Sequence, residues 1–170
     1  MKLLEAIRVE AQSCIVEETS SYPTFDIERL IRQPLLQAVF AETLRLRVNG
    51  FLALYPSHED LTINGYTIPQ NHVILTNSTP GHMDPATSST GTNANYHPFK
   101  FWVGRFLRHD QLTGTSEFSL EGKEGSWMPF GGGSHICLGR RFAKYEIILT
   151  VAFLTTVYDV EVLASQQSLR

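Results

Sequence analysis

The residues of this chain best suited to chemistry lie in one glycine-rich stretch around Cys137. Positions 130–139 read Phe-Gly-Gly-Gly-Ser-His-Ile-Cys-Leu-Gly. Glycine permits unusual backbone angles and lets the main chain approach a flat ligand closely. Backbone N–H groups and the N-terminus of a following helix stabilise a cysteine thiolate. The stretch therefore predicts a thiolate aimed at the metal of a flat cofactor, which is the chemistry of a haem-thiolate loop.

Three other interpretations of the stretch explain less of it. A phosphate-binding loop needs Lys and then Ser or Thr at the helix start, whereas positions 139–141 read Gly-Arg-Arg. His135 and Cys137 could form half of a zinc site, but the chain has one other cysteine, Cys14, and no Cys-x-x-Cys pair. A buried structural cysteine stays open as an interpretation, although it leaves the three consecutive glycines unexplained.

The spacing Phe130-x-x-Gly133-x-x-x-Cys137-x-Gly139 resembles the haem-binding signature of the cytochrome P450 family. The flanks agree, with Trp-Met-Pro before it and Arg-Arg-Phe after it. With 10 Phe, 12 Gly and 2 Cys in 170 residues, these four positions coincide by chance roughly 0.0006 times. The resemblance implies haem b with Cys137 as the iron ligand. The cofactor-binding residues it implies are Phe130, Gly133, His135, Cys137 and Gly139.

Two positions depart from the family pattern. His135 stands where the family usually has the arginine that binds a haem propionate. Histidine donates fewer hydrogen bonds than arginine and carries a charge only near or below about pH 6.5. Leu138 follows the cysteine where proline is common, which we expect to be harmless.

A second motif, Glu42-x-x-Arg45, resembles the family's Glu-x-x-Arg pair. Residues three apart lie on one helix face, and Arg105 matches the family's later arginine, so the resemblance implies a structural triad of Glu42, Arg45 and Arg105. A buried carboxylate between two guanidinium groups is tolerated only where every charge is hydrogen-bonded. We expect the triad to pin the loop before the cysteine against the helix. The alternative is a solvated ion pair of little energy, which we expect for Glu5 and Arg8.

The order of the motifs also agrees with the family. The hairpin around positions 65–69 precedes His-Met-Asp-Pro at 82–85, which precedes Arg105 and then the cysteine. Positions 102–104 read Trp-Val-Gly, where the family usually has a Pro-Glu pair. The histidines outside the motifs, His58, His72, His97 and His109, are expected to be surface or strand residues.

The elements that must position these motifs begin with helices. Apolar spacing predicts a helix over 2–18. Asp26 is placed to cap a short helix that ends at Leu30. Pro34 suits the first position of the next helix, which we expect to continue to about Leu46 and to carry the Glu-x-x-Arg pair.

Short strands follow. We predict strands over 51–55 and 72–76, and a hairpin of 61–63 and 66–68 around Asn-Gly, a strong turn signal. Polar composition predicts loops over 81–98 and 114–126. A last helix over 139–157 and a strand over 158–163 complete the prediction. The fold class expected is mainly α with small β-sheets (α+β), a C-terminal part of the P450 fold, with residues 1–170 as one partial domain.

Composition excludes several classes of protein. The chain has 42% hydrophobic and 18% charged residues, as in an ordinary globular protein. A net charge of −3 and a pI of about 6.1 argue against nucleic acid as a partner. Two cysteines suit a reducing compartment. The longest apolar run, 147–154, is far shorter than the ~20 residues of a membrane span.

The resemblance implies a haem-thiolate monooxygenase that oxidises C–H bonds of a small, lipophilic substrate with O2. An NADPH-dependent reductase is the implied electron donor, and the cytoplasmic face of the endoplasmic reticulum membrane is the implied location of the parent protein. Nothing resembles the family's oxygen-activating helix, so we expect a truncated chain and identify no catalytic residue in it. A haem-thiolate isomerase or dehydratase, or a non-catalytic remnant, remain alternatives.

Overall fold

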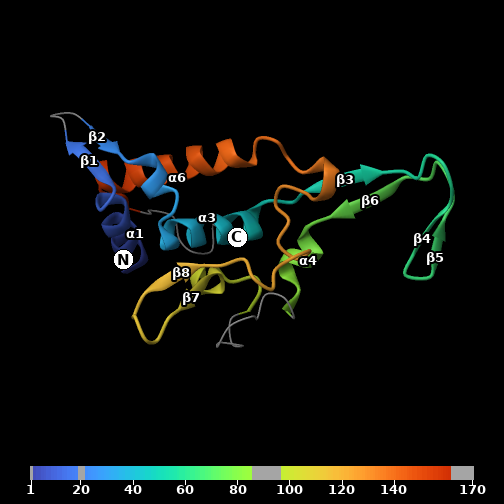
Figure 1. Cartoon of the computed structure of the whole chain (residues 1–170), viewed down its shortest axis with the longest axis horizontal. Helices are drawn as coiled ribbons and strands as arrows, with labels where there is room; N and C mark the ends of the chain where they lie inside the picture. The colour runs from blue at the N-terminus through green and yellow to red at the C-terminus, as the bar shows by residue number, and fades with distance from the viewer. Residues whose placement is uncertain (1, 19–21, 86–96, 162–170) are drawn as a thin grey trace. The chain divides into compact units, whose positions relative to one another are not determined.

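The computed structural model describes residues 2–18, 22–85 and 97–161 (Figure 1). Helices and two-stranded antiparallel sheets make up this part of the chain, so the predicted α+β class is confirmed. Within these residues no helix is long and apolar enough to cross a membrane. The chain divides into two compact units: the first is Met1–Phe40, Leu107–Phe118 and Gly139–Arg170, and the second is Ala41–Phe106 and Ser119–Leu138.

The first unit is built on the packing of α1 against α6. Its elements are α1 (Lys2–Gln12), β1 (Ile15–Glu18), β2 (Pro23–Phe25), α2 (Ile27–Leu30), the start of α3 (Pro34–Arg47), β7 (Leu107–His109), β8 (Ser116–Phe118) and α6 (Arg140–Val157). Ile7 and Ala11 of α1 and Ile148 and Ala152 of α6 are buried. Full burial of a large aliphatic side chain stabilises a fold by about 1.5–3 kcal/mol. Arg8 adds a 2.7 Å hydrogen bond from Nε to the carbonyl of Thr155.

The first predicted helix is too long. The helix ends at Gln12, and Ile15–Glu18 forms a strand that pairs antiparallel with Pro23–Phe25. Ile15 and Val16 are β-branched and prefer a strand, and the carbonyl of Cys14 accepts the Asp26 N–H at 2.8 Å. Pairing with the strand Pro23–Phe25 therefore outweighs the helical spacing of the apolar residues.

The predicted starts of the next two helices are confirmed. Asp26 Oδ1 accepts the N–H of Arg29 at 3.0 Å and caps α2, and Pro34 is the first residue of α3. The start of α3 has a partner that the sequence did not reveal. The two carboxylate oxygens of Glu10 accept the N–H groups of Leu35 and Leu36, each at 2.9 Å. Burial raises the pKa of Glu10, against the effect of these two bonds.

The second unit contains the end of α3 and the segments around the cysteine. Its other elements are β3 (Phe51–Leu54), β4 (Leu61–Ile63), β5 (Tyr66–Ile68), β6 (Ile74–Asn77), α4 (Thr79–Met83) and two single turns of 3₁₀ helix, η1 (Val103–Phe106) and η2 (Gly133–His135). β3 pairs antiparallel with β6, with Phe51 opposite Asn77. These strands form an arm that ends in the β4–β5 hairpin (Figure 1).

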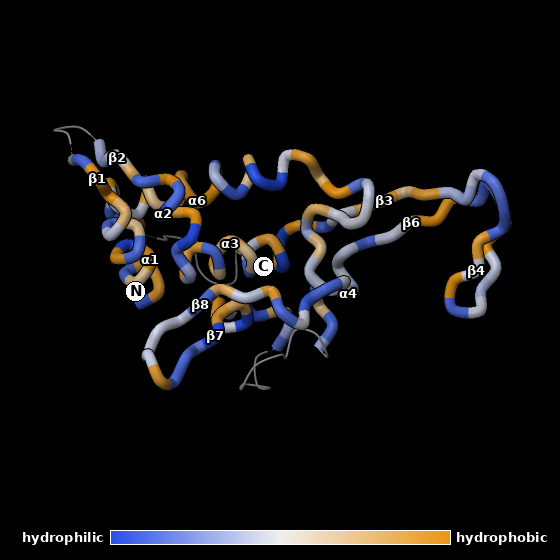
Figure 2. Tube along the Cα trace, in the orientation of Figure 1, coloured by the Kyte–Doolittle hydropathy of each residue, from blue (hydrophilic) through white to orange (hydrophobic). Residues whose placement is uncertain are grey.

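The Asn-Gly turn is confirmed as the hairpin turn. Asn64 and Gly65 have φ of 50° and 84°, the left-handed values that a tight hairpin turn requires at both positions. The strand expected over 72–76 starts two residues later, at Ile74. Figure 2 shows apolar residues along β3 and β6, where Phe51 and Leu75 remain exposed.

Two predicted loops contain secondary structure. The expected loop 114–126 includes β8, which pairs with β7. Its polar residues make the turn: Gly114 has φ of 69° and donates its N–H to the carbonyl of Asp110. The expected loop 81–98 begins inside α4, and its positions 86–96 lie outside the described residues.

Of the helix and the strand predicted for the end of the chain, the helix is confirmed. α6 spans Arg140–Val157 with Gly139 as its N-cap residue. Residues 158–161 form no strand, and the remainder of the strand predicted over 158–163 lies outside the described residues.

Candidate functional site

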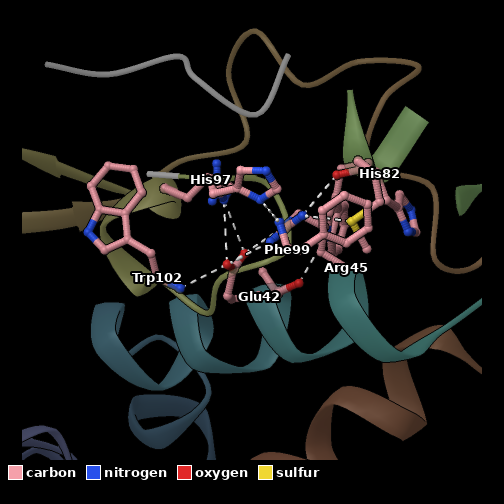
Figure 3. A network of polar contacts seen from close by, with 10 residues as sticks. Glu42, Arg45, His82, His97, Phe99 and Trp102 are labelled. Carbon is pink, nitrogen blue, oxygen red and sulfur yellow. Dashed lines mark hydrogen bonds and ion pairs between the residues drawn. The ribbon is translucent and has the colours of Figure 1, made fainter. Parts of the chain in front are cut away.

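Glu42 is the centre of a fully buried network of charges in the second unit (Figure 3). Its carboxylate accepts two hydrogen bonds from Arg45, from Nε at 2.7 Å and from Nη2 at 2.9 Å. Arg105 Nε lies 3.4 Å from Glu42 Oε2, and the backbone N–H of Trp102 donates to Oε1 at 2.9 Å. We call Glu42, Arg45 and Arg105 the ion-pair cluster.

The geometry of the cluster follows from local structure. Glu42 and Arg45 are three residues apart on α3, which places both on one face. Arg105 reaches them from η1. A two-point contact between guanidinium and carboxylate is among the stronger hydrogen-bonded pairs in proteins. In contrast, the Glu5–Arg8 pair is an exposed contact of 3.4 Å, as the sequence predicted.

The cluster carries an excess of buried positive charge. Lys123 is also buried, with Nζ 5.5 Å from the centre of the Phe106 ring. Burial lowers the pKa of Lys123, and the charge of Arg105 adds to this effect. Burial likewise lowers the pKa of Arg105, while the charge of Glu42 opposes the change. The charge of Glu42 opposes the fall in pKa of both Arg105 and Lys123 and so stabilises their charged forms.

Trp102 and Gly104 give a physical reason for the departure from the family's Pro-Glu pair. The Trp102 ring lies 5.4 Å from the guanidinium carbon of Arg105, close enough for a cation–π contact. A Cβ at Gly104 would lie 2.6 Å from the same ring. Gly104 thus leaves room for the indole, and position 102 contributes both an N–H to Glu42 and a ring to Arg105.

The segment that leads to Cys137 is tied to the rest of the second unit at its start. We call residues 128–137 the cysteine loop. Just before it, Trp127 donates its indole N–H to the carbonyl of Ala41 in α3 at 3.1 Å. The N–H of Met128 donates to Nε2 of His82 at 3.0 Å, and the carbonyl of His82 accepts from Arg45 Nη1 at 2.9 Å.

The loop itself is closed by a hydrogen bond from the N–H of Cys137 to the carbonyl of Phe130, at 2.9 Å. Gly131 and Gly133 have φ of 75° and 59°, left-handed values that glycine adopts without the cost that other residues meet. The thiol of Cys137 is exposed, unlike that of Cys14, which is buried.

A cavity of about 480 Å³ opens beside the loop, within the size range of small-molecule sites. It is lined by two groups of residues, those at the ends of β3 and β6 and those of the cysteine loop. The lining residues are Val48, Gly50, Phe51, Leu52, Thr76, Asn77, Ser78, Met128, Pro129, Phe130, Gly131, Gly132, His135 and Cys137.

Three of the five residues expected to bind the cofactor therefore lie at one cavity. These are Phe130, His135 and Cys137. Gly133 starts η2 and is absent from the lining, where Gly131 and Gly132 stand instead, and Gly139 is the N-cap residue of α6. The other wall residues come from β3 and β6 and from positions beside them, two chain segments that strand pairing brings together.

The residues present fit a flat, largely apolar macrocycle with anionic edges. The walls are mostly aliphatic, aromatic or glycine, the thiol supplies a soft metal ligand, and the His135 ring supplies a polar group at the same cavity. The sequence model of the cytochrome P450 family matches residues 2–169. The chain belongs to the cytochrome P450 family.

Relatives from fungi and from humans show the same relationship. The chain is 35% identical to the cytochrome P450 monooxygenase efuG of Hormonema carpetanum, over 95% of this chain and 31% of the relative. It is 36% identical to the cytochrome P450 monooxygenase calL of Penicillium decumbens, over 95% of this chain and 29% of the relative. The chain is 32% identical to the steroid 21-hydroxylase of Homo sapiens, over 76% of this chain and 22% of the relative.

The chain thus spans about a third of the length of these two fungal P450 relatives. The P450 family is haem-dependent, and its haem is protoporphyrin IX. The region of similarity contains the ion-pair cluster, the cysteine loop and the cavity.

Proposed function

We propose that this chain forms the thiolate side of a haem site in a P450 monooxygenase, with Cys137 as the proximal iron ligand. The observation that supports this most is the exposed Cys137 thiol at a cavity walled by Phe130 and glycines. A buried structural cysteine would not be exposed. Cys14, at 0% exposure, is the cysteine that fits that description.

Each residue of the loop has a proposed part in holding the cofactor. Cys137 supplies the thiolate, and its N–H bond to Phe130 fixes the direction of the loop. Phe130, which lines the same cavity as Cys137, would pack against the bound cofactor beside the thiolate. Gly133 and Gly139 allow the main chain to approach the ring, together with Gly131 and Gly132 on the cavity wall.

His135 is the proposed partner of a haem propionate. Its side chain is at the cavity and exposed, so it can donate a hydrogen bond to a carboxylate in either protonation state. The bond gains charge assistance when the imidazole is protonated.

The ion-pair cluster has a supporting part in this proposal. Glu42, Arg45 and Arg105 hold the segment before the cysteine against α3, through His82 and Met128. None of the three is a catalytic residue in our proposal, because none lines the cavity of Cys137.

When bound, a thiolate-ligated haem activates O2 for oxygen insertion into a C–H bond, with electrons from an NADPH-dependent reductase. We propose a small lipophilic substrate for the longer protein to which this chain corresponds. The name of the human relative, a steroid 21-hydroxylase, states such a substrate for that protein. By the same resemblance, we propose the cytoplasmic face of the endoplasmic reticulum membrane as its location.

The carbon monoxide difference spectrum of the reduced, haem-loaded protein tests the ligand. We expect the red-shifted Soret band of a thiolate-ligated complex, lost in Cys137→Ala and kept in Cys14→Ala, the matched control. A band that survives Cys137→Ala would refute the assignment, and a chain that takes up no haem would favour a non-catalytic remnant.

Turnover by the full-length protein separates monooxygenase from isomerase or dehydratase. A monooxygenase consumes O2 and depends on the reductase and NADPH. Product formation from an oxygenated substrate without either would instead support the isomerase or dehydratase alternative.

A further inference from the structure

His82 is the residue of α4 that contacts both the ion-pair cluster and the cysteine loop. Its carbonyl accepts a hydrogen bond from Arg45 Nη1 at 2.9 Å. Its ring atom Nε2 accepts the backbone N–H of Met128, the first residue of the loop, at 3.0 Å. The side chain is 2% exposed. One buried residue therefore joins the charged network to the segment that carries Cys137.

The hydrogen bond from Met128 assigns a charge state to the ring. A nitrogen that accepts an N–H must carry a lone pair, so a neutral His82 carries its proton on Nδ1. An imidazolium has a proton on both nitrogens and could not accept the Met128 bond. The contact as it stands therefore requires an uncharged His82.

The surroundings of the ring favour that uncharged state. Arg45, Arg105 and Lys123 line the same small cavity as His82, and Glu42 is the carboxylate that faces them. Burial lowers the pKa of His82, and the charge of Arg45 lowers it further, although a hydrogen-bond interaction of the ring with the Arg45 backbone raises it in part.

We propose that His82 is a positioning residue for the cysteine loop: its neutral imidazole holds the Met128 N–H and so ties the start of the loop to the ion-pair cluster. The part of this inference that concerns haem rests on the proposed function of Cys137. The part that concerns Met128 does not.

The contacts beyond Met128 show how a change at His82 reaches the thiolate. Met128, Pro129 and Phe130 line one wall of the cavity, and the carbonyl of Phe130 holds the N–H of Cys137. The hydrogen bond from the Trp127 indole to Ala41 does not involve His82. Loss of the His82 bond should therefore shift the loop without releasing it.

Two substitutions separate the acceptor from the space that the ring fills. His82→Leu removes the acceptor and keeps a similar volume. His82→Gln keeps an oxygen that can accept the Met128 N–H and that does not titrate. A role in packing alone predicts similar behaviour for the two variants, whereas a positioning role predicts that only His82→Gln resembles the unchanged protein.

Hydrogen exchange of the Met128 amide in the full-length protein without haem is the first measurement. We expect exchange to become about tenfold faster in His82→Leu, the effect of losing roughly one buried hydrogen bond, and to stay near the original rate in His82→Gln. Equal protection of the Met128 amide in both variants would overturn the proposal.

The carbon monoxide spectrum of the haem-loaded protein is the second measurement, taken between about pH 8 and pH 5. We expect the unchanged protein to lose part of its thiolate band toward low pH, His82→Leu to show a reduced band at every pH, and His82→Gln to show a band that changes less with pH. Identical profiles for all three would refute an effect of His82 on the thiolate.

The two measurements distinguish failure of the proposed role of Cys137 from failure of the proposed role of His82. Absence of a thiolate band in the unchanged protein refutes the role of Cys137, while a Met128 amide that follows His82 still supports positioning. If His82→Leu does not fold, the comparison of His82→Gln with the unchanged protein across pH decides the matter, because only the histidine loses its acceptor on protonation.

Discussion

The ion-pair cluster and the cysteine loop lie in the same unit but place their functional side chains in opposite environments, one buried and one exposed. The cluster buries three charged side chains, each at 3% exposure or less, and Glu42 is bound on several sides. The loop leaves Cys137 exposed on a backbone that needs glycine at left-handed angles. The cluster uses its polar groups to hold the fold, and the loop keeps its reactive atom open for a ligand.

This contrast shows that the cost of removing a side chain depends on which groups remain around the position. Removal of a cluster member leaves a buried charge without its counter-charge, which is costly for folding. Removal of the Cys137 sulfur leaves an exposed position with little cost to folding, but takes away the proposed iron ligand. Stability measurements and spectra should therefore separate the two regions.

The largest effect on stability should come from Glu42→Ala. The substitution leaves Arg45 and Arg105 buried with no carboxylate between them, and we expect a loss of about 3–5 kcal/mol in the free energy of unfolding. Urea denaturation measures this. Glu5→Ala, in the exposed pair with Arg8, is the control, for which we expect about 0–1 kcal/mol. Equal losses would mean that burial does not distinguish the two pairs.

Gly104→Ala should have the next largest effect. The new Cβ would lie 2.6 Å from the Trp102 ring, so the indole must leave Arg105. We expect a loss of about 1–3 kcal/mol, as for other overpacked sites, with reduced protection of the Trp102 N–H that donates to Glu42. Unchanged thermal unfolding and unchanged tryptophan fluorescence would contradict this account of positions 102–104.

Gly131→Ala tests the loop. Gly131 has φ of 75°, and a left-handed conformation costs other residues about 1–2 kcal/mol. The neighbouring Gly132 has an extended backbone, and its Cβ would meet nothing closer than 3.9 Å, so Gly132→Ala is a matched control. Urea denaturation should show a loss for Gly131→Ala alone. A loss for Gly132→Ala of the same size would show that space, not backbone angle, is limiting.

The smallest effect should be the contribution of His82 to the pH dependence of stability. Its pKa in the folded chain is lower than its ordinary value, so the unfolded chain binds more protons in the interval between the two. Stability from this group is therefore present above the ordinary histidine pKa of about 6.5 and is lost as pH falls below it. Unfolding free energies across this range should fall less steeply in His82→Gln.

Local sequence predicted those elements that carry their own signals. Asp26, Pro34 and the Asn64–Gly65 turn act within a few residues, and all three were predicted correctly. The strand at Ile15–Glu18 and the β7–β8 hairpin were not, because each strand depends on a partner that compensates for weak local preference. The Glu42–Arg45 pair could be placed from helical spacing, whereas the burial of Lys123 and His82 could not.

By itself, the sequence determined the family of this chain and the residue types of its site. The glycines, the cysteine and the helical spacing of charged residues are local features, so they can be recognised from the order of the residues alone. Only the tertiary structure decided that β3 and β6 complete the cavity of Cys137, that Trp102 covers Arg105, and that His82 joins the cluster to the loop. These contacts join residues dozens of positions apart, and hydrogen-bond geometry and burial become defined only when packing brings such residues together.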